Sequence, residues 1–309
     1  MVHRKTLRVG KNVLMANNFR DKFVQRLLNG LKDKGLFLKD AEQSLLLDAL
    51  NMIFDYCPNI GILGKTGVGK SSLCNALFGE KIAKISDVEA CTRNVQEILL
   101  PVGDKGINLF DVPGVGENSE RDKEYANLYS TLLPKLDLVI WVLSMNDRAY
   151  ETDLRFYEKV FKSRLGNVPF LIVINKAELM EPAAEYFNSS PRALSVKQKE
   201  NIEAKKQYVS QQFGIPIDRI VEISATEEIN LATLLVKMIT LLPPNAALSL
   251  ANRAKPIQPK PGEQAVNIES SAWQKFVVIA DAVISNIPGL GVVYKAIKGI
   301  FNFLKSLFS

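Results

Sequence analysis

Histidine and cysteine are scarce in this chain: its 309 residues include one histidine, His3, and three cysteines. Zinc sites and Ser–His–Asp or Cys–His catalysis draw on histidine, so the composition argues against both kinds of site. A disulfide framework needs more cysteines at patterned spacing, so we expect reduced thiols and a cytoplasmic protein. The basic N-terminal stretch lacks an apolar run before a small-residue cleavage site, so no signal peptide is expected.

Long hydrophobic runs are also missing. The two apolar segments near the C-terminus, 273–286 and 292–308, are separated by the helix-breaking stretch 287–291. Each is shorter than the roughly 20 apolar residues that a membrane-spanning helix needs. In the second segment, polar residues recur every three or four positions opposite an apolar and aromatic face, and three of them are Lys295, Lys298 and Lys305. This pattern is typical of a helix that lies in a membrane interface, and a helical hairpin packed on the protein or on a second copy explains it equally well.

The net charge of +6 is unevenly distributed. Residues 1–58 and 244–309 each carry a net charge of +4, whereas residues 59–243 carry −2. An excess of positive charge at both ends points to an anionic partner, either a nucleic acid or a lipid surface. An ordinary solvated surface is the alternative, since no run of five like charges occurs.

The central part of the chain alternates between short apolar strands and helical stretches. A Gly-rich turn at 103–106 separates two strands and predicts an antiparallel hairpin. Near-continuous apolar strands, each followed by a helix, are typical of a mostly parallel sheet with helices on both faces. The sequence therefore predicts an α/β fold with six strands, at 59–63, 94–103, 107–114, 136–143, 168–175 and 218–224.

Four regions follow from these patterns. Helical periodicity at 17–31 and 38–56 predicts an N-terminal helical extension over 1–58. The α/β domain covers 59–243. A proline-rich stretch over 244–270 has little apolar periodicity and is predicted to be a semi-rigid linker. The C-terminal amphipathic helical segment occupies 271–309.

Residues 64–71 fit the phosphate-binding pattern G-x-x-x-x-G-K-S, and they follow a predicted strand and open a predicted helix. In such a loop, backbone N–H groups turn toward phosphate oxygens and the helix N-terminus adds a positive dipole end. Lys70 is expected to reach the β- and γ-phosphates, and the Ser71 hydroxyl to bind Mg²⁺. The predicted phosphate-binding residues are Gly64, Lys65, Thr66, Gly67, Val68, Gly69, Lys70, Ser71 and Ser72.

Three further motifs stand at the ends of predicted strands. Asp111-Val112-Pro113-Gly114 comes 41 residues after Lys70. An Asp there can hold Mg²⁺ through water, and the Gly114 N–H can meet the γ-phosphate. The other two motifs are Asn175-Lys176-Ala177-Glu178 and Ser224-Ala225.

Together with Thr92-Arg93, these motifs resemble the five-motif set of Era-like GTPases, a branch of the translation-factor-related P-loop class, over residues 59–242. GKTGVGKSSLCNALFG and DVPGVGENSERDKEYANLY are similar to a prophage-associated group of that branch. The resemblance implies GTP or GDP and Mg²⁺ as ligands. It assigns catalytic roles to Lys70, Thr92 and Gly114, and Mg²⁺ contacts to Ser71, Thr92 and Asp111. It implies that Asn175 and Lys176 frame the base, and that Ala225, after Ser224, offers its backbone N–H to guanine O6.

Two departures from this family pattern bear on base choice and on hydrolysis. Glu178 stands where the family has Asp. Its carboxylate can accept hydrogen bonds from guanine N1–H and the 2-amino group, which adenine lacks, so guanine is favoured and ATP remains the alternative. Val115 stands where Ras-like enzymes place a water-orienting Gln. Intrinsic hydrolysis is therefore expected to be slow, unless a partner or residues such as Glu117 or Asn118 assist.

The leading functional hypothesis is a Mg²⁺-dependent GTP-hydrolysing switch that acts at an anionic membrane surface through residues 271–309. An RNA- or ribosome-associated GTPase is the first alternative, and a slow or non-hydrolysing nucleotide-dependent scaffold is the second. A homodimer formed through the GTPase domain or the tail is a further candidate assembly. The expected location is the cytoplasm, with peripheral association with the inner membrane.

Overall fold

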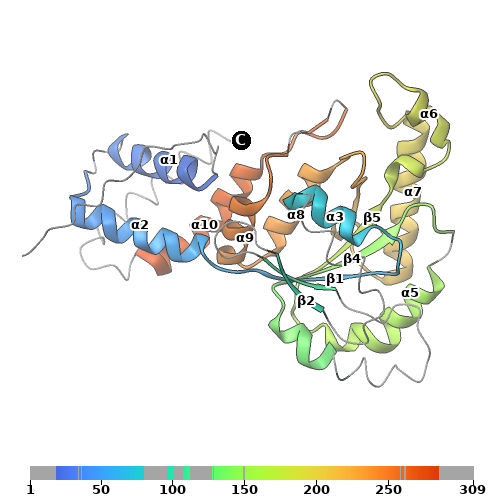
Figure 1. The fold of residues 1–309 in the computed structure, drawn as a ribbon, viewed down its shortest axis with the longest axis horizontal. Helices are drawn as coiled ribbons and strands as arrows, with labels where there is room; N and C mark the ends of the chain where they lie inside the picture. Colours follow the sequence, from blue (N-terminus) through green and yellow to red (C-terminus); the bar gives the residue numbers. More distant parts are fainter. Residues whose placement is uncertain are drawn as a thin grey trace, which may run out of the picture.

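The fold is built on a six-stranded sheet with the strand order β2-β3-β1-β4-β5-β6 (Figure 1). The computed structural model describes residues 19–33, 35, 37–79, 96–100, 107–111, 127, 129–148, 150–257, 259–260 and 262–284. The strands are β1 (Asn59–Leu63), β2 (Gln96–Leu100), β3 (Ile107–Asp111), β4 (Leu138–Ser144), β5 (Phe170–Asn175) and β6 (Ile220–Glu222). All neighbouring strands are parallel except β2 and β3, which form the predicted antiparallel hairpin.

The central strands are buried on both faces, which explains their unbroken apolar sequences. Every residue of β4 is buried. Its side chains alternate between two hydrophobic cores, with Ile140 in one and Trp141 in the other. The chain is therefore a three-layer α/β fold, as predicted.

Helices on both faces complete these two cores. One core contains side chains from α3 (Lys70–Phe78) and α8 (Leu231–Leu241). The other contains side chains from α5 (Glu151–Phe156), its helical continuation to Arg164, and α7 (Val196–Phe213). A short helix, α6 (Ala183–Asn188), lies in the segment between β5 and α7, which we call the insert.

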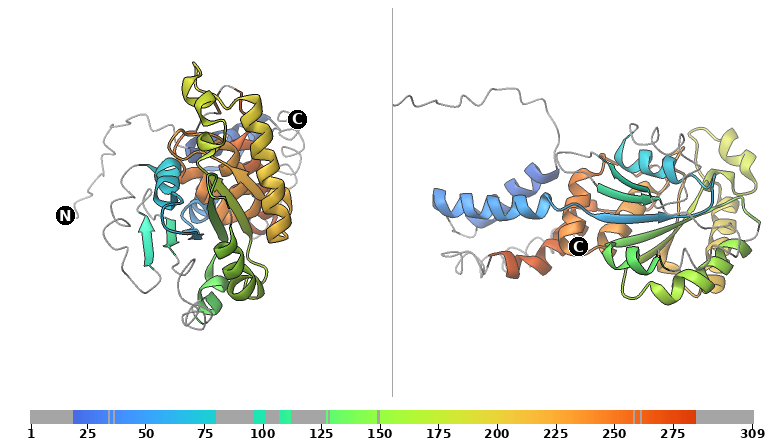
Figure 2. Two further views of the ribbon diagram at one scale, coloured as in Figure 1. Left: turned by 90° about the vertical axis from the view of Figure 1, so that its right-hand side faces the viewer. Right: turned by 60° about the horizontal axis from the view of Figure 1, so that its bottom comes forward.

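The predicted N-terminal helices are confirmed as α1 (Phe19–Asp33) and α2 (Asp40–Phe54). They lie beside α10 (Ile268–Ile284), beyond the edge of the sheet where β1 begins (Figure 2). Phe23 of α1 stacks on Trp273 of α10 with ring centroids 3.9 Å apart. The helical extension therefore belongs to the same hydrophobic core as α3 and α8.

The prediction of a linker over 244–270 is wrong for its first part, because Pro244–Arg253 forms a helix, α9. Pro244 occupies the first turn, where a missing N–H costs no hydrogen bond. Ala246, Ala247, Leu248 and Leu250 are fully buried against neighbouring helices. Alanines and leucines are strong helix formers, so the two prolines mark a helix start rather than a linker.

The C-terminal segment begins earlier than predicted, since α10 starts at Ile268. Ala272, Trp273 and Phe276 are buried in the core, so at these positions the segment packs on the protein. Residues 285–309, which hold the amphipathic pattern, lie outside the described residues. Within the described residues, no helix has the length and apolar character to cross a membrane.

Candidate nucleotide site

The loop between β1 and α3 has the conformation that its glycines allow. Gly64 and Gly69 have φ angles of +144° and +94°. A Cβ atom on Gly64 would lie 2.4 Å from the carbonyl oxygen of Val142, and one on Gly69 would lie 2.3 Å from Nδ2 of Asn175. Both glycines are thus required where the loop passes close to β4 and β5.

Lys70, the first residue of α3, extends its side chain back over this loop. Its Nζ donates hydrogen bonds to the carbonyl oxygens of Gly64, at 2.9 Å, and Lys65, at 3.4 Å. The ammonium group and the N-terminal turn of α3 therefore lie at the same place, which suits an anionic phosphate chain. Ser71 and Ser72 follow in that first turn and are half-buried.

The remaining loop residues divide by exposure. Thr66 and Gly67 are exposed at the tip, while the Val68 side chain is 4% exposed and packs in the core. Val68 can thus contribute only its backbone to a phosphate site. Lys65 points away to Asp153 of α5, and its Nζ lies 2.6 Å from Oδ2 of that carboxylate.

Asn175 and Lys176, which were expected to frame the base, contact the phosphate loop from its other side. Buried Asn175 donates from Nδ2 to the Val68 carbonyl at 2.9 Å. Its Oδ1 accepts the backbone N–H of Ala225 at 3.0 Å. Lys176 has a φ of +68° and donates from Nζ to the Gly67 carbonyl at 2.7 Å. One amide side chain therefore joins the phosphate loop to residues 224–230, which we call the base loop.

Ala225 and Ser224 both make hydrogen bonds that fix the base loop. The backbone N–H of Ala225, which was expected to meet guanine O6, donates to Oδ1 of Asn175 in this structure. Ser224 also acts within the base loop, since its hydroxyl accepts the backbone N–H of Glu227 at 3.0 Å. Both residues shape the loop through these bonds.

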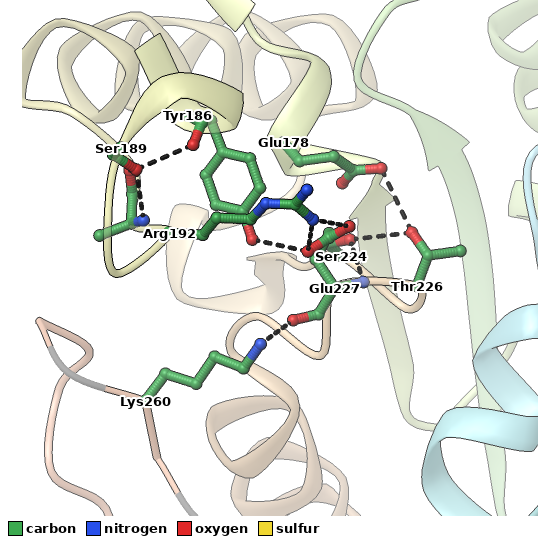
Figure 3. A network of polar contacts seen from close by, with 9 residues as sticks. Glu178, Tyr186, Ser189, Arg192, Ser224, Thr226, Glu227 and Lys260 are labelled. Carbon is green, nitrogen blue, oxygen red and sulfur yellow. Dashed lines mark hydrogen bonds and ion pairs between the residues drawn. The ribbon is translucent and has the colours of Figure 1, made fainter. Parts of the chain in front are cut away.

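Glu178 gives the site a carboxylate that protein groups only partly satisfy. The residue is 6% exposed, and its Oε1 lies 3.4 Å from the hydroxyl of Thr226 (Figure 3). Its buried Oε2 has no hydrogen-bond partner among the residues that the structure describes. A buried carboxylate oxygen without a donor is costly, so this atom fits a ligand that brings N–H groups.

Asp111 is the last residue of β3, in register with Ile62 of the neighbouring strand β1. Both strands end at the edge of the sheet that carries the phosphate loop, so Asp111 is placed beside that loop. Thr92 and Gly114, the other two residues expected at the phosphates, lie outside the described residues.

Two carboxylates near the site were not predicted. Asp153 is 1% exposed and accepts a hydrogen bond from Nε1 of Trp141, at 3.2 Å, in addition to its contact with Lys65. Burial raises the pKa of Asp153, although Lys65 and Trp141 both favour its charged form. The second, Glu227, lies in the base loop and accepts hydrogen bonds from Tyr186 and Arg192 of the insert.

Several known proteins are similar to this chain. Residues 59–176 match the family described as 50S ribosome-binding GTPase. The uncharacterized protein YkfA of Escherichia coli (strain K12) is 36% identical over 90% of this chain and 93% of its own length. The uncharacterized protein YfjP of the same strain is 38% identical over 72% of this chain and 74% of its length. GTPase Era of Caldicellulosiruptor saccharolyticus is 29% identical over 60% of this chain and 55% of its length.

The chain belongs to the Era-like GTPases. Its similarity to YkfA and YfjP supports the expected prophage-type group within that branch. As an Era-like GTPase, the protein binds GTP and GDP with Mg²⁺ and hydrolyses GTP. The buried oxygen of Glu178 fits the N1–H and 2-amino groups of guanine, and adenine offers neither donor.

Of the residues expected to contact Mg²⁺, the structure describes Ser71, in the first turn of α3, and Asp111, at the end of β3. A hydroxyl at the start of α3 and a carboxylate at the end of β3 are oxygen donors, which Mg²⁺ prefers. Mg²⁺ held by these residues would neutralise negative charge on the phosphate chain.

Proposed function

We propose that the protein is a Mg²⁺-dependent GTP switch with slow intrinsic hydrolysis. The arrangement of Lys70 and Asn175 carries the proposal, because the ammonium lies within the phosphate loop and the amide ties that loop to the base loop. Triphosphate and guanine are then held by parts of one connected structure.

We expect the protein to promote GTP hydrolysis mainly by electrostatic stabilisation of the transition state. Phosphoryl transfer to water spreads negative charge over the γ-phosphate oxygens, and Lys70 with the backbone N–H groups of the loop stabilises that charge. The sequence offers Val115 rather than a glutamine to orient water, which supports a slow rate. Loss of the γ-phosphate would release Thr92 and Gly114 and change the conformation around them.

Nucleotide binding by Lys70→Ala and Ser71→Asn tests this proposal. Lys70→Ala removes the ammonium, so we expect GTP affinity to fall by about tenfold or more, as for the loss of charge-assisted hydrogen bonds. Ser71→Asn is expected to weaken binding in Mg²⁺ and to have little effect in EDTA. Calorimetry measures both, and Lys197→Met on the exposed face of α7 is the control. Undiminished GTP affinity in both variants would refute the site.

The proposed partner of the switch is an anionic membrane surface, contacted by residues 285–309. The support is the charge pattern of this stretch, in which Lys295, Lys298 and Lys305 lie opposite apolar and aromatic residues. Since α9 and α10 belong to the core, removing everything after residue 242 would damage the fold. Charge substitution in the full chain is the cleaner test.

The triple variant Lys295→Gln, Lys298→Gln, Lys305→Gln is compared with wild type in sedimentation with phosphatidylglycerol vesicles. We expect wild type to sediment and the variant to remain largely in solution, with the difference shrinking as salt rises. Equal sedimentation of the two proteins contradicts the membrane proposal.

An RNA partner is the second candidate, favoured by the family description as 50S ribosome-binding GTPase. Salt-dependent binding of ribosomal RNA by wild type, lost in the same triple variant, would favour RNA over lipid as the anionic partner.

A further inference from the structure

The base loop has a strained backbone. Glu228 and Asn230 have φ angles of +53° and +54°, a region that non-glycine residues rarely occupy. Such conformations persist only where the surroundings enforce them, and they cluster at functional sites. Groups outside the base loop must therefore hold its backbone in this conformation.

The segment from Lys255 to Glu263, between α9 and α10, supplies three of these groups; we call it the strap. Lys255 pairs with the Glu228 carboxylate at 2.7 Å. Lys260 donates from Nζ to the backbone carbonyl of Glu227. Glu263 accepts the backbone N–H of Asn230 at 2.9 Å. The strap thus contacts both strained residues and the residue before them.

The strap is itself held in shape on the side that faces the loop. Glu263 accepts the backbone N–H of Lys260 at 3.0 Å, which closes a turn within the strap. Lys199 of α7 donates to the carbonyl of Gly262 at 3.3 Å. Contact with Lys255 lowers the pKa of Glu228, so the Glu228 carboxylate remains ionised at neutral pH.

The insert holds the base loop from the opposite direction (Figure 3). Glu227 accepts hydrogen bonds from the hydroxyl of Tyr186 at 3.0 Å and from Arg192 at 3.2 Å. Burial and the bond to Glu227 raise the pKa of Tyr186 to about 12, so its hydroxyl stays a donor. A cavity of about 290 Å³ lies between insert, strap and loop. Because this cavity leaves the base loop without close packing on that side, polar contacts hold the loop in place there.

We propose that Lys260 and Glu263 of the strap are positioning residues for guanine recognition. The base loop reaches Glu178 through Thr226 and Asn175 through Ala225. A loop released from the strap would leave both of these groups less well placed. The strap therefore slows dissociation of guanine nucleotide, and it links the C-terminal helices to the base site. This inference rests on guanine binding at that site.

The test compares full-length Lys260→Met and Glu263→Ala with wild type. The measured quantities are the dissociation rate of fluorescently labelled GDP and the ratio of affinities for GDP and inosine diphosphate. Inosine lacks the 2-amino group, so the ratio reports the contact with Glu178. We expect dissociation about tenfold faster in each variant, with association changed by less than about twofold, because charge-assisted bonds to the loop are lost. The preference for GDP should fall by a similar factor.

Matched controls come from α7, where Lys197 and Glu200 form an exposed pair at 3.2 Å. Lys197→Met and Glu200→Ala make the same chemical changes away from the loop and are expected to behave as wild type. Folded strap variants with wild-type dissociation rates and an unchanged ratio overturn the inference. A wild type that binds neither nucleotide would instead contradict the proposed function.

A second measurement needs no variant. Coupling between two sites is reciprocal, so GDP should slow amide hydrogen exchange in the strap of wild type. Unchanged exchange in residues 255–263 at saturating GDP contradicts the inference even if the variants fail to fold.

Discussion

Glu178 shows how one extra methylene is accommodated at the base site. The longer side chain is still buried, and Thr226 contacts one of its oxygens, while the other has no hydrogen-bond partner in the part of the chain that the structure describes. The sequence identified the departure from the family pattern, but only the structure shows that the carboxylate stays within the site.

Substitution of Glu178 separates charge from length. Glu178→Asp keeps the charge, so we expect GDP affinity to stay within about threefold of wild type or to increase. Glu178→Gln replaces an acceptor with a donor, so we expect GDP affinity to fall by about tenfold or more. Calorimetry with GDP and ADP measures both effects. Equal binding of GDP and ADP by wild type would show that Glu178 does not select the base.

Sequence reasoning found the residues that belong to contiguous motifs and missed those that act through distant partners. Lys65 was assigned to the phosphate loop, but nothing local indicated its contact with Asp153 on α5. Glu227 likewise lies two residues after Ala225, and its partners Tyr186 and Arg192 lie in an insert with no motif. Such pairs follow from tertiary packing, which a single sequence does not encode at fixed spacing.

The junction between α2 and the sheet depends on one carboxylate. Asp137, just before β4, accepts the backbone N–H of Asn59 at 2.8 Å and the hydroxyl of Tyr56 at 3.0 Å. It thereby joins the end of the helical extension to the starts of β1 and β4. Burial nevertheless raises the pKa of Asp137 above its ordinary value of 3.8.

This shift predicts a pH dependence of stability. Between 3.8 and the raised pKa, the folded state binds more protons at Asp137 than the unfolded state, so its contribution to the free energy of unfolding rises as pH falls. Asp137→Asn should remove this contribution. Tyr56→Phe should enlarge it, because the tyrosine hydroxyl favours the charged form. Urea unfolding at pH 7 and pH 4.5 measures both, and identical pH dependence in all three proteins contradicts the assignment.

Among the helices and strands, prediction succeeded where the apolar periodicity was strong. It failed where prolines were taken as evidence against a helix. The parallel strands, the hairpin and the helices α1 and α2 were expected from their patterns. Helix α9 was missed because Pro243 and Pro244 suggested a linker, although the alanines and leucines after them favour a helix. The apolar face of α9 is short, and its burial depends on neighbours that the sequence does not identify.

The architecture as a unit was predictable in its α/β part and not in its helical part. Strand-end motifs fixed which edge of the sheet carries the site, because parallel strands place their carboxyl ends together. From the sequence, residues 1–58 and 271–309 were predicted to be two separate helical segments outside the α/β domain. The structure instead packs α1, α2, α9 and α10 into one core, through contacts such as Phe23 with Trp273.

Arg253 has a consequence for how the protein is made. This buried side chain of α9 donates to the carbonyl oxygens of Phe54 and Tyr56, at the end of α2. About 190 residues separate α2 from α9, so at roughly 5–20 residues per second the ribosome synthesises α2 some 10–40 s before its partner. During that interval the apolar faces of α1 and α2 lack their native cover. We therefore expect chaperones in the cell to bind the newly synthesised helices α1 and α2 rather than the α/β part of the chain.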